Sequence, residues 1–164
     1  MSNWVFAFTL IAALGSALMA GLFFVFSNSV MTAFGKLPPA TGIAAMQSIN
    51  VWILNPVFFA VFFGTSAISV LLALVALLSL AQPWALLLLA GGLCYFIGSL
   101  LVTMFFNVPL NNRLAAAQPG TAEAANLWTE YLRVWTAWNH VRTVLSLAAT
   151  ALFILALCRG IVAG

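Results

Sequence analysis

The sequence predicts an all-α fold, a transmembrane four-helix bundle that forms a single domain over residues 1–164. The first observation is composition, because 65% of the residues are hydrophobic and 4% are charged, whereas about a quarter of a soluble domain is charged. The second is the presence of four apolar stretches, each long enough to cross the ~30 Å hydrocarbon core of a bilayer. Helices are expected for all four, since an open strand leaves its backbone polar groups unsatisfied in lipid.

The four spans are expected at about 4–26, 52–80, 84–108 and 138–158. The first, "WVFAFTLIAALGSALMAGLFFVF", carries no charge; no Lys or Arg precedes it and its apolar core is longer than that of a signal peptide, so we expect it to stay in the membrane. The second runs from "WILNPVFF" to "LLALVALLSL", and the third is "WALLLLAGGLCYFIGSLLVTMFFNV". The fourth ends in "VLSLAATALFILALC".

The connections between the spans differ in length and charge. Only "AQP" joins the second span to the third, whereas the connections 27–51 and 109–137 are long and polar. With four spans, both long connections lie on the same side. Because they contain Lys36, Arg113 and Arg133, the positive-inside rule makes that side cytoplasmic. We expect a multi-pass integral membrane protein, of the bacterial inner membrane, with the lipid bilayer as its main partner.

The net charge and the small number of metal-ligating side chains exclude nucleic-acid-binding proteins and metal-binding proteins. The formal net charge of +3 reflects only two acids, Glu123 and Glu130, and Lys and Arg do not cluster as nucleic-acid binding requires. Cys94 and Cys158 lie in apolar runs without metal-ligand spacing and are interpreted as small buried side chains. With His140 as the single histidine and no acid cluster, we predict no metal site built from side chains, and a haem would have only one obvious axial ligand.

Polar side chains gather at the long-connection end of the predicted bundle. In "FFNVPLNNRLA", Asn107 and Asn111 are four residues apart and share a face if the helix continues. Pro109 removes a backbone hydrogen bond and kinks or ends the helix there. These amides either cap the helix end or bind a ligand. Asn112 and, from the first connection, Asn50 are further candidates for ligand binding.

A second polar group lies in "LWTEYLRVWTAWNHVRT". At 100° per residue, one helix face carries Trp128, Leu132, Trp135, Asn139 and Arg142. His140 points about 160° away from Arg142 on a straight helix. The stripe is either an interfacial Trp belt with a snorkelling Arg, or an aromatic-walled pocket in which Arg142 and Asn139 bind a planar anion through the two-pronged guanidinium fork.

These segments resemble the anthrone oxygenase-like family of small four-span membrane proteins. The resemblance is carried by "FSNSVMTAF" and "MQSIN", by "FFNVPLNNRLA", and by the Trp-x3-Asn-x2-Arg pattern of Trp135, Asn139 and Arg142. It covers about residues 20–150. Many bacterial members have no assigned function, whereas the characterised fungal members oxidise anthrones to anthraquinones. The resemblance implies that this reaction needs neither metal nor flavin.

The resemblance also implies roles for individual residues. Trp135 and Trp138 are expected to bind a flat, lipophilic substrate. Arg142 would stabilise its anion as a preorganised charge, together with the amides of Asn107, Asn111 and Asn139. His140 is the best candidate for a general base, because imidazole exchanges protons near neutral pH. If helix geometry keeps it out of the pocket, Glu130 or a water molecule takes the proton.

Three functions fit these residues. The first is an enzyme that oxidises a lipophilic, anthrone- or phenol-like aromatic with O2 and without a cofactor. The alternative is a non-catalytic or accessory protein that holds a quinone, a lipid or a partner helix. A proton-driven transporter is less favoured, because no span contains an acid. The small-residue clusters "ALGSALMAG" and "AGGL" predict close helix contacts, either within the bundle or in a homo-oligomer.

Overall fold

The computed structural model describes residues 1–162, which form seven α-helices, α1 to α7, and three π-helical segments, η1 to η3. The prediction of an all-α bundle is confirmed, and no strand occurs among these residues. Four helices are long and apolar enough to cross a membrane: Asn3–Gly35, Pro56–Leu77, Ala85–Ala115 and Ala122–Val162. The chain is therefore an integral membrane protein by the length and composition of its helices.

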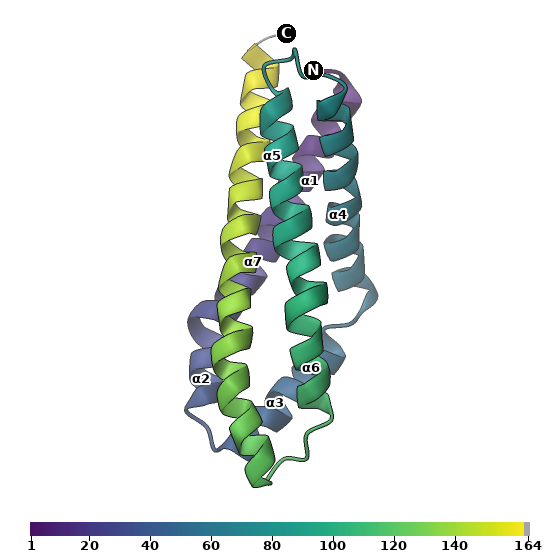
Figure 1. Cartoon of the computed structure of the whole chain (residues 1–164). Helices are drawn as coiled ribbons and strands as arrows, with labels where there is room; N and C mark the ends of the chain where they lie inside the picture. Colours follow the sequence, from purple (N-terminus) through teal and green to yellow (C-terminus); the bar gives the residue numbers. More distant parts are fainter. Residues whose placement is uncertain (163–164) are drawn as a thin grey trace.

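The helices form a closed ring in which neighbours run in opposite directions (Figure 1). Helix α1 (Asn3–Val25) packs against α7 (Ala122–Val162) and α4 (Pro56–Leu77), and α5 (Ala85–Tyr95) packs against α4 and α7. The start of α1, the end of α7 and the short α4–α5 turn lie at the upper end of the view. The lower end contains α2 (Met31–Gly35), α3 (Pro39–Trp52) and α6 (Val108–Ala115).

Two of the long helices contain π-helical segments. The first, η1 (Phe26–Val30), continues α1 into α2, and η2 (Phe96–Leu101) and η3 (Thr103–Asn107) continue α5 into α6. Pro109, expected to kink or end its helix, does not end it, because the helix changes from π to α register at Val108 and the proline lies in the first turn of α6. A proline is tolerated there, since the first N–H groups of an α-helix have no intrahelical partner.

Helix ends differ from the expected spans on the long-connection side. Residues expected in polar connections form α2, α3, α6 and the first third of α7. The second long helix begins at Pro56 rather than near 52, because Asn55 caps it: its Oδ1 accepts from the Phe58 N–H at 3.0 Å. Hydropathy marks where a helix enters lipid, whereas capping and proline mark where the helix begins.

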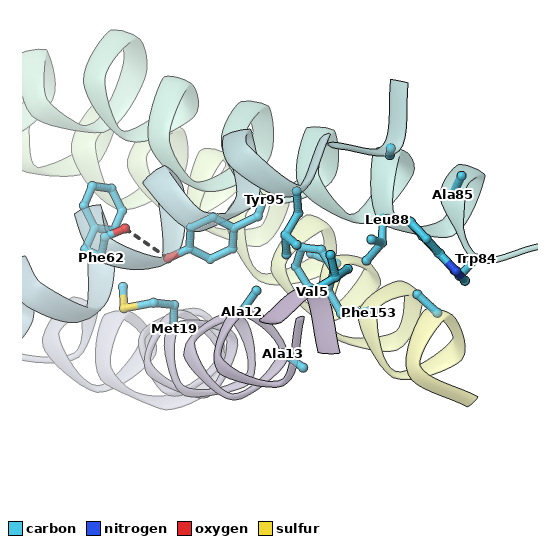
Figure 2. Packing of buried hydrophobic residues seen from close by; sticks show 14 of the residues in the cluster. Val5, Ala12, Ala13, Met19, Phe62, Trp84, Ala85, Leu88, Tyr95 and Phe153 are labelled. Atoms are coloured by element: carbon cyan, nitrogen blue, oxygen red, sulfur yellow. Dashed lines mark hydrogen bonds between the residues drawn. The ribbon is translucent and has the colours of Figure 1, made fainter. Parts of the chain in front are cut away.

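The larger hydrophobic core fills the upper half of the bundle. In Figure 2, the labelled side chains of Met19, Phe62, Tyr95 and Phe153 come from four different long helices, and the Tyr95 hydroxyl donates to the Phe62 carbonyl oxygen at 3.5 Å. In the two small-residue clusters, Gly15, Gly91 and Gly92 lie close to neighbouring helices of the bundle, whereas Gly21 has open space around it. A Cβ added at Gly92 would lie 2.5 Å from a backbone carbonyl oxygen of α4. We call this cluster the upper core.

A second, smaller core lies at the lower end. It joins α2, α3, α6 and the amino-terminal part of α7 through Met31, Ile43, Met46, Leu110, Leu114, Trp128, Tyr131 and Trp135. We call it the lower core. Helix α7, with 41 residues, is roughly 60 Å long at 1.5 Å per residue, about twice the hydrocarbon thickness. Its exposed large apolar side chains begin only at Val144, so on α7 the residues of the lower core precede the apolar part of the helix surface.

Candidate functional site

A layer of buried polar side chains separates the upper core from the lower core. It consists of Asn107, Asn139, Arg142 and Thr143, all at most 6% exposed, and of Ser27 and Asn111 beside them. The segments η1, η3, α6 and α7 all contribute to it. Since a buried polar group is costly unless it is hydrogen-bonded, the bonds of this layer decide what it can do.

Arg142 is the charged group of this layer. Its Nη1 donates to Thr103 Oγ1 at 3.2 Å, its Nη2 donates to Asn139 Oδ1, and its Nε has no hydrogen-bond partner. The guanidinium carbon lies 4.2 Å from the ring centre of Phe23 and 5.1 Å from that of Trp135. No carboxylate of the described residues pairs with it, since the one ion pair found there joins Arg113 to Glu130. Arg142 is thus a buried cation held by neutral groups.

Asn139 fixes the position of Arg142. While its Oδ1 accepts from the guanidinium, its Nδ2 donates to the Phe23 carbonyl at 2.7 Å and to Ser27 Oγ at 2.6 Å. Both of these acceptors lie where α1 passes into the π-helical segment η1. A π-helical segment interrupts the i→i−4 ladder and is frequent at functional sites. Asn139 thereby ties the register change in α1 to the buried cation on α7.

A cavity of about 100 Å³ lies against Arg142 and is open on one side. Its walls are mainly apolar and come from α1, α3, α4 and α7; they include Leu22, Phe26, Met46, Ile49 and Phe58. Its polar lining residues are Asn50, Thr103, Asn111 and Arg142. An apolar cavity with a few polar groups is the usual form of a small-molecule site. We call it the Arg142 cavity.

The Trp135 side chain forms one wall of the Arg142 cavity. Its Nε1 donates to Asn111 Oδ1 at 2.8 Å, and the Tyr131 hydroxyl donates to the same oxygen at 2.8 Å. Because an indole nitrogen only donates, this bond fixes the orientation of the Asn111 amide. The Nδ2 of Asn111 therefore points away from Trp135. Below the cavity, Asn107 donates to the Trp135 carbonyl at 3.2 Å.

The predicted stripe on α7 forms one buried face. Trp128, Trp135, Asn139 and Arg142 are each at most 6% exposed, so Arg142 does not snorkel to the surface. This burial favours the pocket over the interfacial belt. Of the expected site residues, Asn50, Asn111, Trp135 and Arg142 line the cavity. Asn107 and Asn139 support it from behind.

Three expected site residues do not reach the Arg142 cavity. His140 is exposed and lines a separate groove with Phe24 and Asn28, because it lies on the other side of an unbroken helix. Trp138 stacks on Phe106 with ring centres 3.7 Å apart, and Asn112 is exposed on α6. His140 is therefore not placed to take a proton from a ligand in this cavity. Within residues 1–162, no group of three His, Cys, Asp or Glu side chains could hold a metal ion.

Several functional positions were missed by sequence reasoning. Tyr131 lies one turn before Trp135 and continues the stripe, so helical spacing alone could have found it. Thr103, Ser27 and the Phe23 carbonyl lie on other helices. Their contacts with Arg142 and Asn139 depend on how the helices pack, and the sequence carries no local signal for them.

Comparison with known proteins places this geometry in a family. A family model described as anthrone oxygenase matches residues 57–152, which is more than half of the chain. The matched segment contains α4, the α5–η3 helix, α6 and α7 up to Leu152, and thus Thr103, Asn111, Trp135, Asn139 and Arg142. No curated protein and no solved structure matches the chain.

Proposed function

The chain belongs to the anthrone oxygenase family, and we propose that it binds a lipophilic, anthrone- or phenol-like aromatic as its anion and oxidises it with O2. The observation that carries the proposal is Arg142, a buried guanidinium with no carboxylate partner and an unpartnered Nε at an apolar cavity. A buried charge without a counter-charge is costly. An anionic ligand oxygen removes that cost.

The walls of the cavity indicate what else the ligand must be. Trp135 presents a flat face, and most other lining side chains are aliphatic or phenyl groups. A planar hydrocarbon skeleton gains most from such walls, since aromatic rings stack with offset or tilted geometry. An engineered apolar cavity of about 150 Å³ accommodates benzene. In the Arg142 cavity of about 100 Å³, a ligand with several rings therefore extends through the open side.

The oxidation of an anthrone by O2 requires few protein groups. An anthrone loses a proton from the ring carbon opposite its carbonyl, and the resulting anion shares its charge between that carbon and the oxygen. The carbon adds O2 and a proton, which gives a hydroperoxide. The O–O bond then breaks as the remaining C–H proton leaves, giving a second carbonyl and one water. Arg142 stabilises the first anion by a fixed charge, and water at the open side of the cavity takes the proton.

A second candidate function is binding without turnover. It is favoured by one observation: apart from Arg142, no titratable side chain lines the Arg142 cavity, and Glu130, the other base considered, is paired with Arg113 at the surface. Such a site would hold the anion of a quinone-like molecule without a side chain that accepts a proton from carbon.

The proposal also includes the orientation of the protein in the membrane. The long-connection end contains Lys36, Arg113 and Arg133, which supports a cytoplasmic position for the lower core under the positive-inside rule. In a bacterium this corresponds to the inner membrane. The Arg142 cavity then lies near the cytoplasmic boundary of the hydrocarbon, where both lipid-dissolved aromatics and water have access.

The test is O2 uptake by the purified protein in detergent with an anthrone as substrate. Arg142→Met should reduce uptake to the spontaneous rate, whereas Arg133→Met, the same change at an exposed position of α7, should leave it unchanged. Arg142→Lys keeps the charge but not the fork and should retain part of the activity. Circular dichroism of each variant reports folding. Uptake that is equal in all folded variants refutes the proposal, and Arg142-dependent binding without uptake favours the second candidate.

A further inference from the structure

The Arg142 cavity has two polar ends. At one end the guanidinium of Arg142 contacts Thr103 and Asn139. At the other end the side chains of Asn50 and Asn111 both lie beside the Tyr131 hydroxyl. The Trp135 ring lies between the ends, with its Nε1 bonded to Asn111 and its face 5.1 Å from the guanidinium carbon. Trp135 and Arg142 are seven residues apart, roughly 10 Å along the helix axis.

The amide of Asn50 has an unused donor at this second end. Asn50 comes from α3 and lines the cavity, and its Nδ2 is buried without a hydrogen-bond partner. The Tyr131 hydroxyl lies beside the Asn50 side chain and gives its own proton to Asn111. A contact with its oxygen engages at most one of the two Nδ2 hydrogens of Asn50, which leaves the other N–H without an acceptor. A buried N–H without an acceptor is costly. An acceptor atom of a ligand in the cavity would satisfy it.

We propose that Asn50 binds a second oxygen of the ligand, opposite the oxygen that Arg142 holds. The site thus favours aromatics with an oxygen acceptor at each end, a para-quinone pattern. This inference rests on the proposed function, because it takes Arg142 as the group that holds the first oxygen. In the oxidation described above, the carbon that gains oxygen lies across the ring from the existing carbonyl. Asn50 then donates its N–H to the oxygen that is added.

The inference predicts which ligands respond to a change at Asn50. Anthrone has one oxygen on its middle ring, whereas 9,10-anthraquinone has the same three rings and a second oxygen opposite the first. Asn50→Leu should weaken quinone binding about 3- to 10-fold, the size expected for one neutral hydrogen bond, and leave anthrone binding unchanged. Asn50→Asp, which keeps the size but replaces the donor by a carboxylate, should weaken quinone binding further.

The experiment measures the dissociation constants of both ligands by quenching of tryptophan fluorescence, in detergent and without O2. Asn112→Leu, an exposed position on α6, is the control and should change neither constant. Equal losses for the two ligands in Asn50→Leu would mean that the residue only shapes the cavity, which overturns the inference. If Arg142→Met changes neither constant, or wild-type protein binds neither ligand, the proposed function itself fails. If Arg142→Met weakens binding but Asn50→Leu weakens the binding of anthrone and anthraquinone equally, only the inference on Asn50 fails.

Discussion

Replacing Asn139 by Asp gives the sharpest test of the buried cation. Asn139 Oδ1 already accepts from Arg142 Nη2, so the substitution puts a carboxylate in contact with the guanidinium at almost unchanged size. Ser27, which accepts from Asn139 in the native protein, can turn its hydroxyl toward the carboxylate. The Phe23 carbonyl loses the N–H that it accepts from Asn139, so circular dichroism and thermal unfolding must first show that the variant folds; in the folded variant Arg142 acquires the internal counter-ion that it lacks.

The size of the effect follows from the charges. Two opposite unit charges about 4 Å apart attract by about 4 kcal/mol at the effective dielectric constant of ~20 that suits protein sites. A ligand anion must compete with that attraction. At about 1.4 kcal/mol for each factor of ten, the full energy corresponds to a loss of roughly 1,000-fold in affinity. Water at the open side of the cavity screens part of it, and we expect a loss of about 30- to 1,000-fold.

The assay compares an anionic ligand with a neutral one of the same skeleton. The anionic probe is 2-hydroxy-1,4-naphthoquinone, which is deprotonated at neutral pH, and the neutral probe is 1,4-naphthoquinone; titration calorimetry gives both dissociation constants. Asn139→Asp should lower the affinity for the anion far more than for the neutral quinone. Asn112→Asp adds the same charge at an exposed position and should affect neither. If Asn139→Asp binds the anion as tightly as wild type, Arg142 is not the anion-binding group.

Three further predictions concern stability, measured by thermal unfolding in detergent. Gly92→Ala should destabilise the bundle by about 1–3 kcal/mol, because the added methyl group would lie 2.5 Å from an α4 carbonyl oxygen. Gly64 has open space around it, so Gly64→Ala should not destabilise the bundle. Equal destabilisation by the two substitutions would contradict the packing argument. Asn55→Ala should cost about 1 kcal/mol by removing the cap of α4, whereas Asn55→Asp should keep it; a loss in Asn55→Asp alone would refute the capping role. Arg113→Ala should leave the unfolding midpoint unchanged, since its ion pair with Glu130 has side chains 52% and 42% exposed and such pairs contribute little. A clear drop would show that the pair orders the lower end.

The part of the site that could be predicted lies on one uninterrupted helix. Because α7 runs from Ala122 to Val162 without a break, the angle between any two of its side chains follows from 3.6 residues per turn. That rule placed Trp135, Asn139 and Arg142 on one face and His140 on another, as observed. Family resemblance pointed to His140 as a base, and the exposed position of this side chain gives that role no support.

What could not be predicted depends on contacts between helices. Thr103 contacts Arg142, and the Phe23 carbonyl contacts Asn139, across more than 35 residues of sequence in each case. Pro109 was expected to kink or end its helix. The helix continues because a π-helical segment ends at Asn107 and α6 begins at Val108, and no sequence rule predicts that change of register. The helices in the long connections were missed for a related reason. Hydropathy indicates whether a segment is surrounded by lipid or by water, whereas α3 and α6 pack against other helices of the lower core.

The two cores also experience different solvents. The four apolar helices that could cross a membrane enclose the upper core, and we expect lipid or detergent around it, whereas the lower core lies among α2, α3, α6 and the start of α7, where we expect water to have access. A denaturant such as urea acts from the aqueous phase, so the lower core should open first and the upper core should persist. Unfolding then proceeds in two stages rather than one. Since Trp135 belongs to the lower core and forms a wall of the Arg142 cavity, ligand affinity should disappear in the first stage, while most of the helical signal is still intact.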